Sequence, residues 1–126
     1  MLNKPYSHGR VFMMQQAPSG RDITSAFKYG KIINLFGSEE TPSDRPLEAQ
    51  RYLMRVLDDF HPDHDYLCYA GGDPVLPMLV GMVLAELGLT HVRFLKWNRI
   101  RDAMGQRFSG AYQPITIPII EELEVA

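Results

Sequence analysis

Two glycines and an aspartate separate two apolar stretches, in Tyr66-Leu-Cys-Tyr-Ala-Gly-Gly-Asp-Pro74. A glycine-rich turn between a strand and a helix can bind a phosphate through its backbone amides. Neither complete fingerprint is present, because Gly-x-Gly-x-x-Gly and Gly-Lys-Ser/Thr are both missing. Asp73 is placed to cap the following helix, so its carboxylate would occupy the amides and repel a phosphate. We interpret the turn as a packed corner first, and keep Gly71, Gly72 and Asp73 as candidate ligand-binding residues.

Basic residues near the next strand extend this candidate site. Asn98, Arg99 and Arg101 follow the region where ligands of open α/β sheets bind, outside the carboxyl ends of the strands. The acid that would hold the ribose of NAD is missing there. A broader basic and aromatic surface could bind phosphates or stack on single-stranded nucleic acid; its members are Arg93, Lys96, Trp97, Arg107 and Tyr112. The competing interpretation places the aromatic residues in the core and the arginines on a solvated hairpin.

Other reactive side chains give weaker patterns. His61, Asp63, His64 and Asp65 are metal-binding types, but their spacing matches no zinc signature, and a polar loop explains them. Cys68 lies within an apolar strand, which favours a small buried side chain over a nucleophile. No Gly-x-Ser-x-Gly elbow is present. The sequence therefore predicts no metal or cofactor, and it contains no complete catalytic constellation.

Alternating strands and helices must position these residues. Strands are predicted at 10–14, 31–36, 66–70, 91–97, 107–112 and 115–119, and helices at 22–30, 46–60 and 75–87. Asp22, Asp44 and Asp73 are the expected helix caps, and Pro114 and Pro118 fit an edge strand. This order predicts an α/β fold, a small Rossmann-like sandwich with a mainly parallel core sheet and an antiparallel C-terminal hairpin.

The helix at 75–87 is apolar on nearly its whole circumference. At about 2 kcal/mol for each buried side chain, its nine large apolar residues represent roughly 18 kcal/mol of gross burial. Such a helix needs cover on most sides, either from its own domain or from a partner.

Length and composition set further bounds. The chain has 126 residues, 45% of them hydrophobic, and a net charge of -2. This predicts a single domain over 1–126, with a loose arm at 1–9 and an acidic tail at 121–126. The charge excludes an overall basic field for nucleic acid or an anionic membrane. One cysteine, no signal peptide and no apolar run long enough for a bilayer favour a cytoplasmic protein.

Three segments resemble a group of small uncharacterised proteins of tailed bacteriophages. They are Asp22-Ile-Thr-Ser-Ala-Phe-Lys-Tyr-Gly30, the corner 65–74, and Phe94-Leu-Lys-Trp-Asn-Arg99 followed by Tyr112-Gln-Pro114. The Gly-Asp-Pro corner together with Leu-Lys-Trp is distinctive, whereas Asn98 replaces an expected acid and the glycine before Asp73 is doubled. The resemblance implies a viral accessory protein made in the host cytoplasm, and supplies no catalytic residues.

Three functions remain open. The first is a non-enzymatic accessory protein that binds a host or viral protein or other macromolecule, with a homodimer among the options. The second is a small nucleotide- or phosphate-binding protein, or an enzyme, that uses Gly71–Asp73 with Arg99 and Arg101. The third is weak nucleic-acid binding through the basic hairpin 93–107.

Overall fold

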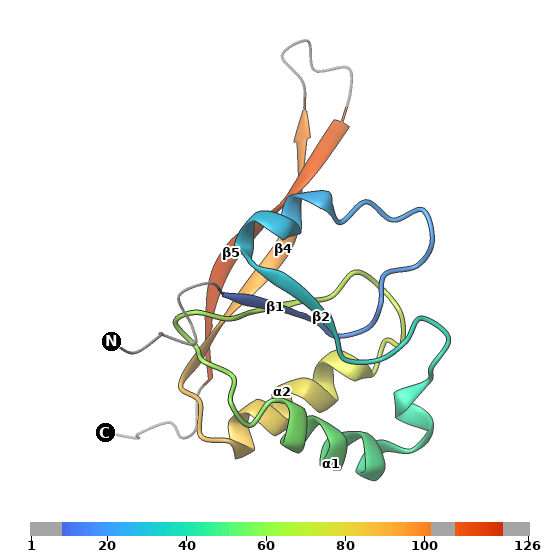
Figure 1. Ribbon diagram of the computed structural model, residues 1–126, viewed down its shortest axis with the longest axis vertical. Helices are drawn as coiled ribbons and strands as arrows, with labels where there is room; N and C mark the ends of the chain where they lie inside the picture. The colour runs from blue at the N-terminus through green and yellow to red at the C-terminus, as the bar shows by residue number, and fades with distance from the viewer. Residues whose placement is uncertain (1–8, 102–107, 120–126) are drawn as a thin grey trace, which may run out of the picture.

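The computed structural model describes residues 9–101 and 108–119, and a five-stranded sheet runs through them (Figure 1). The strands are β1 (Arg10–Met13), β2 (Lys31–Asn34), β3 (Tyr66–Cys68), β4 (His91–Arg101) and β5 (Phe108–Pro118). Their order across the sheet is β2-β1-β3-β4-β5. All neighbours pair in parallel except β4 and β5, which are antiparallel. The predicted α/β class, with a mainly parallel sheet and an antiparallel C-terminal pair, is confirmed.

Helical segments cover both faces of the sheet. They are the 3-10 helices η1 (Thr24–Tyr29) and η2 (Pro42–Asp44) and the α-helices α1 (Pro46–Val56) and α2 (Leu76–Glu86). Right-handed crossovers that run in opposite directions along a sheet place their helices on opposite faces. The chain moves outward from β1 to β2 and then back across the sheet, so η1 lies on one face and α1 and α2 on the other (Figure 1).

Alternation along the strands divides the core in two. Phe12 and Leu67 face α1 and α2, and contribute to a large apolar cluster with both helices. Val11 and Cys68 face η1 and belong to a smaller cluster. Both clusters are buried, which is the expected environment of central parallel strands.

The edge strand β5 is one continuous strand, where the sequence predicted two pieces. Alternate residues of an antiparallel edge strand turn their amides away from the neighbouring strand. On β5 these positions include Pro114 and Pro118, which have no amide hydrogen, as predicted for an edge. The amide of Tyr112 donates to Ser25 Oγ at 2.8 Å, and its carbonyl accepts from Tyr29 Oη at 3.3 Å. The edge is therefore protected against pairing with another strand.

Several predicted boundaries and caps were wrong. The helix expected at 46–60 ends at Val56, and the segment expected as a helix at 22–30 is the shorter 3-10 helix η1. Asp44 does not cap α1, because its carboxylate accepts a hydrogen bond from Thr41 Oγ1 at 2.7 Å and Arg45 is the N-cap. Asp22 does accept the amide of Thr24 at 2.9 Å. Local hydrogen bonds within the loop thus replace the expected cap of α1.

The ends of the chain lie mostly outside the described residues. The predicted acidic tail at 121–126 and all of the predicted arm except Gly9 belong to this group. Gly9 is not loose, since its carbonyl accepts the amide of Lys31 at 3.3 Å and a Cβ there would collide with the carbonyl of His64. Within the described ranges, no helix has the length and apolarity needed to cross a membrane.

Candidate functional site

The glycine corner lies at the carboxyl end of β3. Asp73 is only 8% exposed. Its Oδ1 accepts the amide of Val75 at 3.0 Å, and its Oδ2 accepts the amide of Ser43 at 2.7 Å. The prediction that Asp73 caps the helix was wrong: α2 begins at Leu76, its N-cap is Val75, and the Asp73 carboxylate takes an amide of the turn before the helix. The Ser43 contact, which was not predicted, joins the corner to the loop after β2.

Gln15 fixes the same corner from the end of β1. Its side chain is 1% exposed, and its Oε1 accepts the amide of Asp73 at 2.8 Å. Its Nε2 donates to the carbonyls of Gly37 at 2.9 Å and Glu40 at 2.7 Å. One buried amide side chain from the loop after β1 thus binds the loops that follow β2 and β3. This is the point where the strand order reverses and where open α/β sheets commonly bind ligands.

Both glycines are needed for their backbone conformation, and Gly72 is also needed for space. Gly71 and Gly72 have φ values of 112° and 118°, which side chains rarely adopt. A Cβ on Gly72 would also collide with Gln15 Oε1, whereas a Cβ on Gly71 would stay 3.8 Å from its nearest neighbours. Gly72 therefore allows Gln15 to reach the corner.

The electrostatics of the corner disfavour an anion. Burial alone would raise the pKa of Asp73, but hydrogen bonds from Ser43 and Val75 hold it below its ordinary value. The carboxylate is therefore ionised at neutral pH. It borders a cavity of about 400 Å³ that is also lined by Glu39, Glu40 and Asp44. A phosphate there would meet several negative charges and amides that already have acceptors.

A second cavity of about 600 Å³ adjoins the first through the loop at 38–44. It lies between the end of β2 and the start of α1, and one wall carries Phe36 and Tyr52, whose rings are 5.1 Å apart. Its charged lining is acidic except for Arg45, and consists of Glu39, Glu40, Asp44, Glu48 and Arg45. The carboxyl ends of β1, β2 and β3 therefore form an acidic region.

The structure does not join the glycine corner to the basic candidates. Asn98 lies on β4 and donates to Gln113 Oε1 of β5 at 2.6 Å. Arg99, the next residue, faces the opposite side of the sheet because side chains alternate along a strand. The cavity beside Gly72 is lined by the loop after β2 and not by these residues. Of the other two basic candidates, Arg101 lies in β4 with a side chain that is not described, and Arg107 lies outside the described residues.

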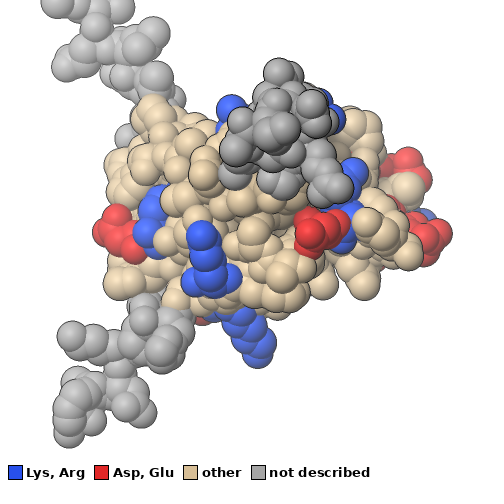
Figure 2. Space-filling model, turned by 90° about the horizontal axis from the view of Figure 1, so that it is seen from above, with Lys and Arg blue, Asp and Glu red and all other residues tan. Residues whose placement is uncertain are grey.

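The predicted basic and aromatic surface is divided by the same alternation. Arg93 and Trp97 lie on the η1 side of β4, whereas Lys96 lies on the α1 and α2 side. The guanidinium of Arg93 lies 4.0 Å from the ring centre of Tyr66. Trp97 is 40% exposed and packs edge-on at 5.0 Å against Tyr112, which is buried. Seen from above, Lys and Arg side chains lie in separate groups, some beside acidic side chains and others among uncharged surface (Figure 2).

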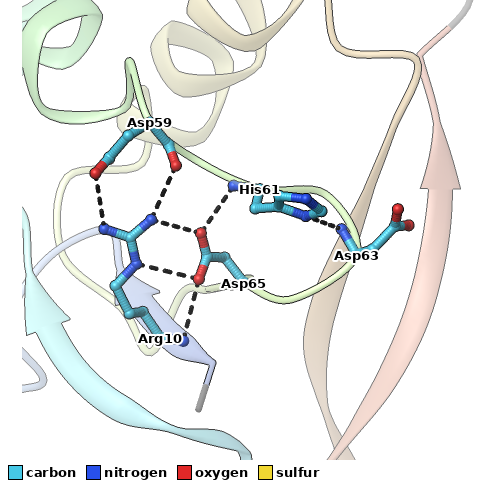
Figure 3. Close-up of polar contacts among 5 residues, drawn as sticks. All are labelled: Arg10, Asp59, His61, Asp63 and Asp65. Carbon is cyan, nitrogen blue, oxygen red and sulfur yellow. Dashed lines mark hydrogen bonds and ion pairs between the residues drawn. The ribbon is translucent and has the colours of Figure 1, made fainter. Parts of the chain in front are cut away.

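At the amino ends of the strands, a buried aspartate holds an arginine (Figure 3). Asp65 is 0% exposed and accepts Arg10 Nε at 3.1 Å and an Arg10 terminal nitrogen at 2.7 Å. Its carboxylate also accepts the amides of Arg10 and His61. Asp59 binds the same guanidinium at 3.2 Å, and these carboxylates raise the pKa of Arg10. The residues suspected of binding a metal therefore include a structural ion pair.

His61, Asp63 and His64, the other residues suspected of binding a metal, contact one another or His91. The amide of Asp63 donates to His61 Nδ1 at 3.1 Å, and its carboxylate lies 3.1 Å from His91 Nε2. The rings of His61 and His64 lie 4.3 Å apart. No group of three or more His, Cys, Asp or Glu side chains in the described ranges is arranged to hold a metal ion.

Cys68 lies under η1 in the smaller core cluster. Burial raises the pKa of its thiol to about 12, so the reactive thiolate is scarce at neutral pH. The residue fills the core, as its apolar neighbours predicted.

Comparison with known proteins identifies the family of the chain. A model of the phage Pam3 gp32-like protein family matches residues 9–117, which include all five strands except the last residue of β5. The chain belongs to this family. This is a family of phage proteins, as the resemblance implied. Searches of the curated proteins and of the solved structures gave no match.

Among the described residues, the most exposed large apolar side chain, Met78, lies on α2, and further exposed apolar residues lie beside it on the same helix. Met78 and Met82 are 64% and 55% exposed, and Val75 at the start of the helix is also exposed. Gly81 and Ala85 are exposed between and beyond them. We call these five residues the outer face of α2. On the neighbouring helix α1, Leu47 is also 58% exposed.

Sequence reasoning missed four residues that position these regions: Gln15, Ser43, Arg10 and Leu47. A polar residue directly after an apolar strand was a usable signal for Gln15, because it lies at the carboxyl edge of the sheet. The partners of Arg10 and Ser43 are 55 and 30 residues away in the chain, so spacing gave no signal.

Proposed function

We propose that this phage protein acts by binding another protein through the outer face of α2, and that it does so in the host cytoplasm. The observation that carries the proposal is the pair of exposed methionines at the centre of that face, Met78 and Met82. Methionine is flexible and polarisable, and it is frequent on surfaces that bind protein partners.

Comparison with α1 supports this assignment. Both helices have 11 residues and lie side by side on the same face of the sheet. The solvent side of α1 carries Glu48, Arg51 and Arg55, the usual composition of an exposed helix surface. Between its first residue and Ala85, α2 has no charged residue at all. An uncharged helix face of this kind is typical of a surface that is covered in the working state.

An exposed leucine of α1 lies near the same surface. The Nε2 of Gln50 on α1 lies 3.9 Å from the sulfur of Met82, and Leu47 precedes Gln50 by one helical turn. Each large apolar side chain that becomes fully buried contributes about 1.5–3 kcal/mol. Covering Leu47, Met78 and Met82 would therefore contribute several kcal/mol to binding.

Binding rather than catalysis is also supported by the fate of the reactive groups. Cys68 is buried, Asp65 is held by Arg10, and Asp73 is held by backbone amides. For the nucleotide-binding alternative, the acidic lining of both cavities is unfavourable. For nucleic acid, the division of Arg93 and Lys96 between two faces is unfavourable.

The proposal is tested by charge placed on α2 with a matched change on α1. Immobilised protein is exposed to lysate of infected host cells, and retained proteins are identified and then tested as purified proteins. We expect the Met78→Glu and Met82→Glu variants to lose a partner that the wild type binds directly. The control Arg55→Glu, on the side of α1 that borders Asn34 and β2, should keep it.

Equal retention by the wild type and both methionine variants would contradict the proposed surface. A thermal-shift screen against nucleotides tests the alternative directly. Stabilisation that disappears in Arg99→Ala would support nucleotide binding and count against this proposal.

A further inference from the structure

We infer that the protein covering α2 is a second copy of this chain, with the two α2 helices antiparallel about a two-fold axis. This inference rests on the proposed function, namely that the outer face of α2 is a protein-binding surface. It goes further because it specifies the occupant, its orientation and the residues that meet.

Gly81 is the first argument. It lies in the middle of α2, where glycine is less favourable to the helix than alanine. It has no positive φ, and a Cβ on it would meet nothing within 4 Å. Neither the backbone conformation nor the packing of this chain therefore requires a glycine. A gap on an exposed apolar helix face does allow a second helix to approach closely, because the distance between helix axes depends on the side chains at the contact.

The pattern of large and small residues matches itself when the helix is reversed. A two-fold axis between Gly81 and Met82 places each Met82 opposite Gly81 of the second copy. The same axis places Met78 opposite Ala85 of the second copy, and all four residues are exposed. Val75 then meets Gly88, which is exposed just beyond the helix. Each large side chain faces a small one, which is the self-complementarity that a two-fold interface requires.

The charge distribution selects the antiparallel orientation. Glu86 is the only charged residue of α2 and lies at its C-terminal end. Antiparallel packing brings each Glu86 near the first turn of the other helix, opposite Pro77. No charged residue of the other α2 lies at that turn, because Glu86 is the only one in the helix. Parallel packing would instead bring the two Glu86 carboxylates together.

The β5 edge of the sheet offers less to a second copy. The outward positions of β5 include two prolines, and the amide and carbonyl of Tyr112 are occupied by Ser25 and Tyr29. Association by strand pairing is therefore blocked at this edge, whereas the outer face of α2 has no such protection.

The experiment measures the mass of the full chain by sedimentation equilibrium from low to high micromolar concentration. We expect a dimer whose dissociation constant rises by at least about tenfold in Gly81→Gln, because overpacking of a close contact is costly. The variant should fold as well as the wild type, since the added side chain has free space and glutamine favours helices. Arg55→Gln, on the far side of α1, is the matched control and should dimerise normally.

Disulfide trapping gives a second readout. Met82→Cys lies beside the axis and should cross-link to its counterpart under mild oxidation, whereas Arg55→Cys should not. A wild type that stays monomeric, or a dimer that tolerates Gly81→Gln and does not cross-link at Met82→Cys, would overturn the inference. If the chain is monomeric but Met82→Glu still abolishes binding of a different protein, the proposed function stands and only the identity of the occupant is wrong.

Discussion

At the amino ends of β1 and β3, the buried carboxylate of Asp65 binds the guanidinium of Arg10; at their carboxyl ends, that of Asp73 binds only backbone amides. Both aspartates join loops that are far apart in the chain. The first is an ion pair with no exposure at the carboxylate, and the second keeps a small contact with solvent. The difference shows that amides at the carboxyl edge, where α/β proteins usually bind ligands, are already occupied by the Asp73 carboxylate, which an anionic ligand would have to displace.

The largest expected effect comes from removing the charge at the amino edge. Asp65→Ala leaves Arg10 without its buried partner and removes the acceptor of two amides. Breaking a buried ion pair from one side costs about 3–5 kcal/mol. We expect a loss of this size in the free energy of unfolding, measured by urea denaturation.

Asp59→Ala is the control for this prediction. It removes the other carboxylate on Arg10, but one that is 62% exposed, so the loss should be about 1 kcal/mol or less. Similar losses in the two variants would mean that Asp65 is not the dominant member of the pair.

The second effect tests the carboxyl edge. Gly72→Ala combines an unfavourable φ with a collision against Gln15, so we expect it to reduce the free energy of unfolding by about 3 kcal/mol. Gly71→Ala shares the φ but has space for the methyl group, and should cost about 1–2 kcal/mol. Urea denaturation of both variants measures the difference. Equal losses would show that Gln15 does not depend on a glycine at position 72.

The sequence predicted most of the elements and little of what joins them. Alternating apolar segments were sufficient for the strands and helices and for the antiparallel pairing of β4 with β5, because these depend on local patterns. The Rossmann-like kinship, the single domain and the candidate ligand residues stay predictions. Gln15 and Asp73 are 58 residues apart, and no local pattern indicates that they meet.

One error could have been avoided from the sequence. Arg93, Lys96 and Trp97 were combined into one surface although all three lie on the predicted strand 91–97, and residues of odd and even number face opposite sides of a strand. Applying that period would have separated Arg93 and Trp97 from Lys96. The exposure of Met78 and Met82 could not be obtained in this way, because it depends on how far α1 extends over α2.

The smallest effect distinguishes the two edges by pH. The pKa of Asp73 in the folded protein lies below its ordinary value of 3.8, so the unfolded chain takes up the proton first on acidification. The stability that Asp73 contributes is therefore present above about pH 4 and is lost as the pH falls through the lower folded pKa. Asp73→Asn should weaken the dependence of the urea midpoint on pH in this acidic range.

Asp63→Asn is the comparison at the amino edge, where a hydrogen bond from the half-buried His91 lowers the pKa of an exposed carboxylate. Because solvent screens that pair, its removal should change the acidic slope less than Asp73→Asn does. The opposite ranking would mean that the amides around Asp73 discriminate little between its charged and neutral forms, and that the carboxyl edge is more open to a ligand than its hydrogen bonds indicate.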